Sequence, residues 1–515
     1  MVKITLMTKS PLKVLFLSAE VSPFSSVGGL SQVAHFLPSE LLRRGYDVRI
    51  FTPKYGTINE GQFPMKMVAS GMKVPTGEVE DSGQPTELIC NIKSFAEAKK
   101  GRPTTYFLEN MEYFEKRANV YGYSDDHIRF ALLSRGALEF IKQGYFMPDV
   151  VHVNDWHTSY FANYLREDAE TDKTLGEVAT LLSLHNLHQG VFDFEHATEM
   201  DFDDGKSRLQ PFFSDRFIKQ NPLKRGIIYA DVVNTVSENY AHEILTEEYG
   251  RGLQNLLKEL RGKLFGVLNG LDYTDFNPLT DKAIKKNFSS KKMELRAENK
   301  LDLQRQFGLE EKPEKPLLCF WGRVDLQKGA NLISETILFI LDELDVQFVI
   351  VGPPEDYFRD FFSKLEKGYP GQVGTHLMFD RQMVRRLAAG GDMLVMPSKY
   401  EPGGIVALEA MHYGCVPVVR ATGGLADSVV DYDAGRNVGT GFTFKKFTRE
   451  GFLVAIVRAM ETYRNKAEWN KIIRRAMETD FSWSHTAEKY MDLYNRAVEF
   501  RKEALSGKLD GGRNR

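Results

Sequence analysis

Apolar runs alternate with amphipathic segments along most of the chain. The first run, VLFLS at 14–18, is followed by an amphipathic segment at 30–44 and then by a second run, DVRIFTP. Short apolar runs of this kind are typical of buried parallel strands, and their alternation with helical segments is typical of βαβ units. The pattern predicts an α/β protein with parallel sheets.

Residues 392–430 show this alternation most clearly. They contain a strand at 393–397, a turn with Glu401, Gly403 and Gly404, a helix over IVALEAMHY, a second strand, VPVV, and a second glycine turn, TGGL. Right-handed crossovers place both turns at the carboxyl edge of a parallel sheet, where such sheets bind ligands. We therefore expect a carboxylate and two sets of free backbone N–H groups at one crevice, as in the donor half of a sugar-nucleotide site.

Two other stretches depart from the alternation. Between 56 and 110, short β-like runs mix with Gly- and Pro-rich turns, so we expect a long excursion from the sheet. From 272 to 316 the composition shifts to Lys, Glu and Asn, which indicates a domain boundary. We predict an N-terminal domain over 1–275, a C-terminal domain over 276–485, a helix over 486–505 and a disordered tail over 506–515.

Composition excludes several classes of protein. At 515 residues, 42% of them apolar and 27% charged, the chain has the size and balance of a globular enzyme with more than one domain. The net charge of -3 gives no broad basic field for nucleic acid or anionic lipid. The three cysteines lack metal-site spacing, and no apolar run has the roughly 20 residues of a membrane span. We expect a cytoplasmic protein without a signal peptide, a metal, or nucleic-acid and membrane partners.

Polar residues end two strands in the N-terminal half. Strand DVVHV is followed by Asp155, Trp156 and His157, and strand ATLLSLHN ends at His185 and Asn186. A carboxylate beside an indole suits a sugar, because the carboxylate bonds to hydroxyls and the indole stacks on a ring face. A capped helix start with Trp156 as packing is the alternative for the first group, and a hydrogen-bonded ring at a strand end is the alternative for His185.

Two cations follow the first strand of the C-terminal half. The turn GRVDLQKG places Arg323 beyond the strand end and Lys328 at the start of the next helix. Helix N-termini attract phosphate through free N–H groups, and the two cations add countercharge. The alternative is a pair of solvated surface cations. A dehydrogenase is disfavoured, because neither glycine turn has the GxGxxG spacing with an acidic ribose ligand.

A collinear series of motifs resembles those of bacterial glycogen synthases and plant starch synthases. They include SAEVSPF, DVVHVNDWH, LHNLHQG, GRVDLQKG, MPSKYEPGGIVALEAMHYG and VPVVRATGGLADSV. The resemblance implies the GT-B architecture: two facing Rossmann-like domains, an active site in the inter-domain cleft, and a C-terminal helix that crosses back to the first domain. It also implies retaining transfer of glucose from ADP-glucose, in preference to UDP-glucose, to the non-reducing end of an α-1,4-glucan such as glycogen, starch or a maltooligosaccharide.

The same resemblance implies roles for individual residues, with no metal or other cofactor. Arg323 and Lys328 would neutralise the departing diphosphate, and Glu401 would hold the glucose hydroxyls. His185 would lie against the glucose near the reaction centre, and Asp155 would orient sugar on the N-terminal side. The further substrate-binding positions would be Asn186, Gly28, Gly29, Gly403, Gly404, Thr422, Gly423, Gly424, Leu425 and Glu409.

Two positions depart from the family pattern. The family's first glycine turn is normally Lys-x-Gly-Gly-Leu, whereas SVGGL places Ser26 at the lysine position. Loss of a charge-assisted bond there is worth about 1–3 kcal/mol, so another group substitutes, donor binding differs, or activity is weakened. Glu409, which many members lack, either bonds a nucleotide ribose or is solvated on the helix surface. Two alternatives to a glucan synthase remain: a retaining glycosyltransferase with another acceptor, and a catalytically impaired glucan-binding paralogue.

Overall fold

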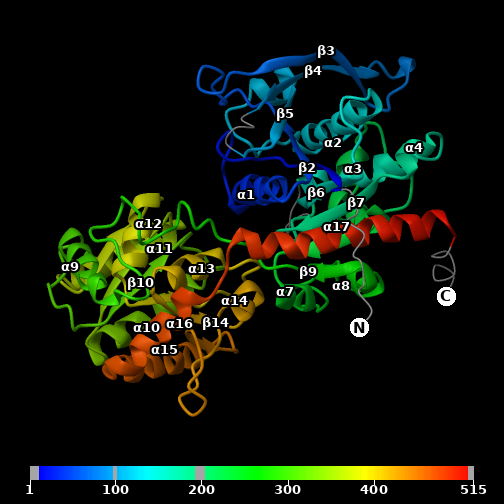
Figure 1. The fold of residues 1–515 in the computed structure, drawn as a ribbon. Coiled ribbons are helices and arrows are strands. Elements are labelled where there is room, and N and C mark those ends of the chain that lie inside the picture. The colour runs from blue at the N-terminus through cyan, green and yellow to red at the C-terminus, as the bar shows by residue number, and fades with distance from the viewer. Residues whose placement is uncertain (1–10, 97–100, 192–202, 508–515) are drawn as a thin grey trace. The chain divides into compact units, whose positions relative to one another are not determined.

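The computed structural model describes residues 11–96, 101–191 and 203–507. The chain forms two compact units, which are described separately (Figure 1). The first comprises Met1–Val236, Glu243–Val267 and Thr486–Arg515, and the second comprises Ser237–His242 and Leu268–His485. Most of the predicted disordered tail, from residue 508 onward, lies outside the described residues.

The described part of the first unit contains a nine-stranded sheet in the order β3-β4-β5-β2-β1-β6-β7-β8-β9. The strands from β5 across to β9 are parallel, and β3 and β4 extend one edge in antiparallel pairing. The bounds are β1 Lys13–Leu17, β2 Asp47–Pro53, β3 Lys66–Pro75, β4 Glu87–Phe95, β5 Thr104–Glu109, β6 Val150–Asn154, β7 Ala179–Leu184, β8 Val232–Thr235 and β9 Leu264–Gly266.

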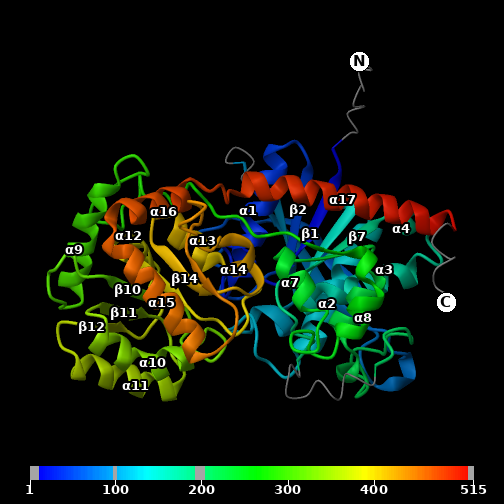
Figure 2. The same ribbon diagram turned by 90° about the horizontal axis from the view of Figure 1, so that it is seen from below.

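Helices cover both faces of this sheet, as a parallel sheet requires. Figure 2 shows α1 and α17 on one side of β1, β2 and β7, and α2 and α3 on the other. Among the described helices of the whole chain, none is both long enough and apolar enough to cross a bilayer. The bounds are α1 Gly29–Arg43, α2 Asp126–Lys142, α3 Asp155–Asp168, α4 Lys173–Gly176, α6 Pro222–Tyr229, α8 Gln254–Glu259 and α17 Trp483–Leu505. Helix α7, Glu238–Glu243, belongs to the second unit except for its last residue.

Three strands between 56 and 110, β3, β4 and β5, belong to this sheet, so the predicted excursion is wrong. Strand β5 pairs in parallel with β2, and β4 pairs in antiparallel fashion with both β5 and β3. Register shifts between Met67 and Ala69 and between Ala69 and Met72 interrupt β3. Such irregularities break the period-two alternation by which a strand is recognised in a sequence.

The described part of the second unit contains a six-stranded parallel sheet in the order β12-β11-β10-β13-β14-β15. One face packs on α10, α11 and α15, and the other packs on α9, α12 and α13. The bounds are β10 Leu317–Trp321, β11 Gln347–Val351, β12 Val373–His376, β13 Met393–Met396, β14 Val416–Arg420, β15 Phe442–Phe444, α9 Arg296–Gln306, α10 Ala330–Glu343, α11 Asp356–Gly368, α12 Arg381–Gly390, α13 Ile405–His412, α14 Gly423–Ser428, α15 Arg449–Arg464 and α16 Lys466–Glu478.

The last helix, α17, packs on the first unit. The Tyr494 hydroxyl lies 2.8 Å from His152 Nδ1 on β6, and the Tyr490 hydroxyl accepts a hydrogen bond from Asn234 Nδ2 on β8 at 3.2 Å. All four side chains are buried. Burial lowers the pKa of His152 well below its usual value, so its ring is neutral. Helix α17, the last in the described part of the chain, therefore packs on the core around β6 and β8.

Candidate active site

Three turns of the second unit lie together at the carboxyl ends of β10, β13 and β14, which are neighbours in the sheet. The Lys399 N–H donates to the Gln327 carbonyl oxygen at 2.8 Å and joins the first turn to the second. The Gly424 N–H donates to the Glu401 carbonyl oxygen at 2.9 Å and joins the second turn to the third. The predicted gathering of these turns at one edge is confirmed.

Glycines permit this close backbone packing. A Cβ atom on Gly423 would lie 2.0 Å from the Glu401 carbonyl oxygen, and one on Gly329 would lie 2.1 Å from the Pro397 carbonyl oxygen. Gly423 and Gly329 also have φ values of 46° and 77°, in the left-handed region that glycine occupies readily. Any side chain at either position would force two turns apart.

A lysine and a carboxylate meet where these turns converge. Lys328 Nζ lies 2.6 Å from Glu401 Oε2, and the buried Ser398 hydroxyl donates to the same oxygen at 3.2 Å. The Lys328 side chain is 14% exposed and that of Glu401 is 8% exposed. Charges so far removed from water interact more strongly than charges at the surface. The structure thus joins the predicted phosphate-binding cation to the predicted glucose-binding carboxylate.

Arg323 lies at the rim of this cluster, with 61% of its side chain exposed. Its Nε lies 3.3 Å from Asp325 Oδ2, and its Nη2 donates to Gln327 Oε1 at 2.8 Å. The Asp325 carboxylate also accepts the Lys328 N–H at 2.9 Å. One acidic residue therefore fixes both cation-bearing positions of the turn and leaves the guanidinium accessible to an anion from solvent.

The expectation of free N–H groups at the TGGL turn is wrong for two of its residues. The Gly424 N–H donates to the carbonyl oxygens of Glu401 and Pro402, at 2.9 and 3.0 Å, and the Leu425 N–H donates to the Thr422 carbonyl oxygen at 3.0 Å. Backbone groups that are out of water find partners within the protein. The Gly424 N–H therefore holds the TGGL turn against the turn after β13 and is not free for a ligand.

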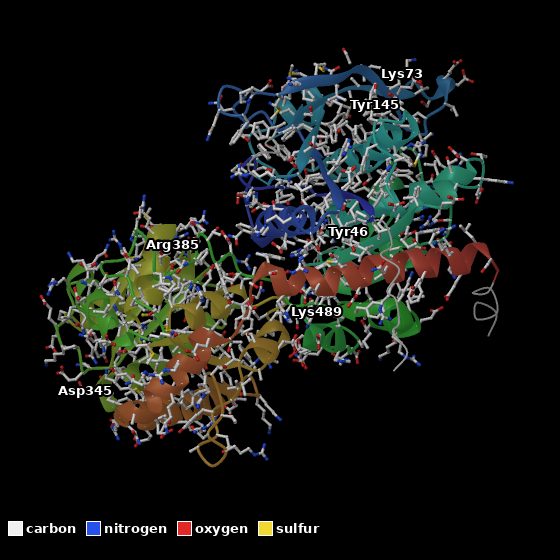
Figure 3. All side chains as sticks on the ribbon, in the orientation of Figure 1. Tyr46, Lys73, Tyr145, Asp345, Arg385 and Lys489 are labelled. Atoms are coloured by element: carbon white, nitrogen blue, oxygen red, sulfur yellow. The ribbon has the colours of Figure 1, made fainter. Side chains whose placement is uncertain are left out.

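The second turn leads into α13, which begins at Ile405 with Gly404 as its N-cap, preceded by Gly403. Glu409 lies on this helix and is 8% exposed, so the alternative of a solvated surface position is wrong. Burial raises the Glu409 pKa to about 7, against the lowering effects of the Trp321 side chain and the nearby guanidiniums of α12. One of these guanidiniums, Arg385 (labelled in Figure 3), lies 3.3 Å from the Asp281 carboxylate.

In the first unit, Asp155 begins α3 and shapes the loop after β7. Its Oδ1 accepts the N–H groups of His185 at 2.7 Å and of Asn186 at 3.4 Å. Its φ of 51° is uncommon for a residue with a side chain, and such backbone strain often accompanies functional sites. Burial raises the Asp155 pKa, opposed by the nearby His185. The structure therefore brings these three predicted residues together at one strand edge.

His185 is a hydrogen-bonded ring at this edge. Its Nε2 lies 2.9 Å from Asn154 Oδ1, and the ring is partly buried. Burial lowers the His185 pKa, although the Asp155 carboxylate opposes this shift. A neutral imidazole held in this way can exchange a hydrogen bond with a sugar hydroxyl without placing a charge beside it.

Trp156 belongs to the core, so the idea that its ring stacks on a sugar is wrong. It is 7% exposed, and its ring meets Phe130 edge-on at a centroid distance of 5.2 Å. The ring of His157 lies 4.3 Å away. The alternative of a packing residue at a helix start is the correct one.

The first glycine turn is closed by Glu20, a residue that the sequence analysis missed. Its buried carboxylate accepts the N–H groups of Val27 at 2.5 Å and of Gly28 at 3.1 Å, just before α1 begins at Gly29. Ser26 is exposed, and its hydroxyl lies 2.8 Å from Ser31 Oγ. The turn therefore presents a hydroxyl where the family's lysine would present a cation. The signal in the sequence was an acidic residue three positions after an apolar strand.

Two exposed apolar side chains at the carboxyl edge of the second sheet were not predicted from the sequence. Met378 and Phe379, which follow β12, are 58% and 77% exposed. Exposed large apolar side chains that lie together can form a ligand-contacting surface. The sequence signal for them was an apolar pair in the short turn between β12 and α12.

One group of three carboxylates among the described residues lies close enough to share a metal ion: Glu60, Glu109 and Glu115. Lys93 Nζ lies 2.9 Å from Glu60 and 2.5 Å from Glu109. Lys54 adds a second ammonium group, 3.3 Å from Glu60. These two lysines pair with the three carboxylates, so the geometry is that of an ion-pair network.

Comparison with known proteins covers both units. A family model described as the starch synthase catalytic domain matches residues 13–259, and one described as glycosyl transferases group 1 matches residues 303–476. A glycogen synthase from Thermotoga petrophila is 37% identical over 494 residues, 95% of this chain and 99% of that protein. One from Moorella thermoacetica is 36% identical over 501 residues, 96% of this chain and 99% of that protein.

Solved structures resemble the chain along nearly all of its length. The catalytic domain of starch synthase IV from Arabidopsis thaliana, bound to ADP and acarbose, matches with a TM-score of 0.81 at 31% identity, over 95% of this chain and 100% of that one. Sucrose-phosphate synthase from Thermosynechococcus elongatus matches with a TM-score of 0.56 at 17% identity, over 95% and 99%, which is a likeness of fold. The predicted GT-B architecture of two parallel-sheet α/β domains is confirmed.

Proposed function

This chain belongs to the family of glycogen and starch synthases, and from this premise we propose that it transfers glucose from ADP-glucose to the non-reducing end of an α-1,4-glucan with retention. The observation that carries the proposal is the Lys328–Glu401 pair, 2.6 Å apart, at the carboxyl edge of a parallel sheet. A partly buried cation beside a buried carboxylate suits a sugar diphosphate, because the cation can bind the phosphates and the carboxylate can bind the sugar hydroxyls.

Charge on the leaving diphosphate grows as the glycosidic bond breaks. Lys328 and the exposed Arg323 are positioned to stabilise that charge, which lowers the barrier more than it strengthens ground-state binding. When the diphosphate takes Lys328 as its partner, the Glu401 carboxylate becomes available to the glucose hydroxyls. These two cations supply the countercharge that a metal supplies elsewhere, so we propose that the reaction needs no metal or other cofactor.

The first unit supplies neutral and acidic groups suited to sugar. Asp155 holds the backbone of His185 and Asn186, and the neutral imidazole of His185 can bond to a glucose hydroxyl. We propose that Asp155, His185 and Asn186 together orient the sugar.

For the donor base we propose adenine, with Phe379 as a stacking surface. The Phe379 side chain is 77% exposed, so stacking a planar base on its ring would remove apolar surface from water and stabilise the complex. The solved starch synthase IV holds ADP, and the bacterial relatives are glycogen synthases. We also propose a cytoplasmic location, since Cys90, Cys319 and Cys415 are all free and buried.

Substitution of the three second-unit residues tests the proposal. Arg323→Ala, Lys328→Ala and Glu401→Ala should each lower kcat with ADP-glucose and glycogen by about a hundredfold or more, because each removes a charged contact made in the transition state. Arg464→Ala is the matched control, since that arginine is 67% exposed at the end of α15. Wild-type rates in all three variants would reject the assignment.

Donor and acceptor choice are tested by initial rates with ADP-glucose and UDP-glucose on glycogen and on small sugars. We expect the higher kcat/KM with ADP-glucose and glycogen. Product found only on small acceptors would favour another glycosyltransferase, and glucan binding without release of nucleotide diphosphate would favour an impaired paralogue. Ser26→Lys, run alongside, should lower the donor KM if the missing cation weakens donor binding, and an unchanged KM would show that the position is unimportant.

A further inference from the structure

A buried arginine connects the turns that carry Glu401. Arg420 ends β14 and is 6% exposed. Its Nε donates to the Ser398 carbonyl oxygen at 2.8 Å, and its Nη2 donates to the Lys399 carbonyl oxygen. Its Nη1 donates to the Lys445 carbonyl oxygen, beyond β15, at 3.1 Å. One guanidinium thus ties the turn after β14 to the turn after β13.

The residue held in this way reaches the Glu401 carboxylate with its side chain. Ser398 is fully buried, and its hydroxyl donates to Glu401 Oε2 at 3.2 Å. Lys328 Nζ lies 2.6 Å from the same oxygen. Two donors on Oε2 fix the orientation of the carboxylate, and Oε1 accepts no hydrogen bond from any described residue.

We propose that Arg420 and Ser398 are positioning residues that hold Glu401 with Oε1 turned toward the substrate glucose. The inference rests on the proposed role of Glu401 in binding glucose. Arginine suits the task because its planar fork can span the carbonyl oxygens of neighbouring residues, which a single ammonium group does not. Arg420 acts through Ser398, and Ser398 acts through Glu401.

A double-mutant cycle separates positioning from general support of the fold. Ser398→Ala in the wild-type background should lower kcat about tenfold with donor KM within twofold, because a hydrogen bond to a charged group has this strength. In a Glu401→Gln background the same substitution should change kcat less than twofold. An equal loss in both backgrounds, or no loss in the wild-type background, would overturn the inference and leave the proposed function standing. An unchanged kcat in Glu401→Gln alone would overturn both.

Arg420→Lys tests whether Arg420 positions Ser398. It keeps the positive charge but removes the fork, so kcat should fall at least about tenfold with little change in donor KM. Arg475→Lys is the matched control, because Arg475 likewise donates to two carbonyl oxygens, those of Gly439 and Asn437, at 2.7 and 3.1 Å in another loop. Thermal unfolding should shift similarly in both variants. An equal loss of kcat in the control would overturn the inference.

Discussion

Replacement of Glu409 by glutamine should change how the stability of the second unit depends on pH. Burial raises the Glu409 pKa from 4.5 to about 7, so the folded protein keeps a proton that the unfolded chain releases between these values. The stability that the neutral carboxyl contributes is complete below pH 4.5 and is lost as the pH rises through 7. With about 1.4 kcal/mol per pKa unit, the wild type should lose about 2–3 kcal/mol of unfolding free energy from this group between pH 5 and pH 8.

Glutamine has nearly the same shape as the neutral carboxyl and does not ionise, so Glu409→Gln should lack this loss. Urea unfolding at pH 5 and pH 8 measures the difference, followed by tryptophan fluorescence, since Trp321, Trp469 and Trp483 all lie in the second unit. Glu461→Gln, at a side chain that is 61% exposed, is the control and should change stability by less than about 0.5 kcal/mol. Parallel pH dependence of Glu409→Gln and wild type would refute the reasoning.

Three further substitutions test the geometry. Gly423→Ala should destabilise the second unit by about 2 kcal/mol or more in thermal unfolding, because the new Cβ would lie 2.0 Å from the Glu401 carbonyl oxygen; a stable, active variant would contradict this packing. Trp156→Phe should cost about 1–3 kcal/mol of stability and leave glucan affinity unchanged in affinity electrophoresis, and lost affinity would restore the sugar-stacking idea. Tyr494→Phe should cost about 1–3 kcal/mol, because His152 Nδ1 loses its buried partner, and unchanged stability would argue against that bond.

Much of the fold was predictable from the sequence because its parallel strands are buried on both faces. Runs such as VLFLS and QFVIV then contain apolar residues at nearly every position, and helices with one apolar face separate them. The antiparallel strands at the edge were not predictable in this way. In β3 the exposed residues do not alternate strictly with the buried ones, so the strand resembles a loop.

Prediction of the candidate site succeeded for residues that follow a strand directly and failed for contacts between distant turns. Asp155, Glu401 and Lys328 could be placed at a sheet edge from local pattern alone. The pattern does not state which carbonyl oxygen an arginine will reach, and Arg420 is 22 residues from Ser398 along the chain. For the same reason, the pattern does not show that the Gly424 N–H finds its partners, the carbonyl oxygens of Glu401 and Pro402, in the turn after another strand.

The packing of α17 on the first unit has a consequence for synthesis on the ribosome. His152 and Tyr494 are 342 residues apart, and at roughly 5–20 residues per second translation takes roughly 20 s to 1 min to cover that distance. Until α17 emerges, the face of the sheet that carries His152 and Asn234 is uncovered, and these two side chains lack their tyrosine partners. A nascent chain of this protein therefore cannot complete the core of its first domain until translation has reached α17, after the second domain has been made.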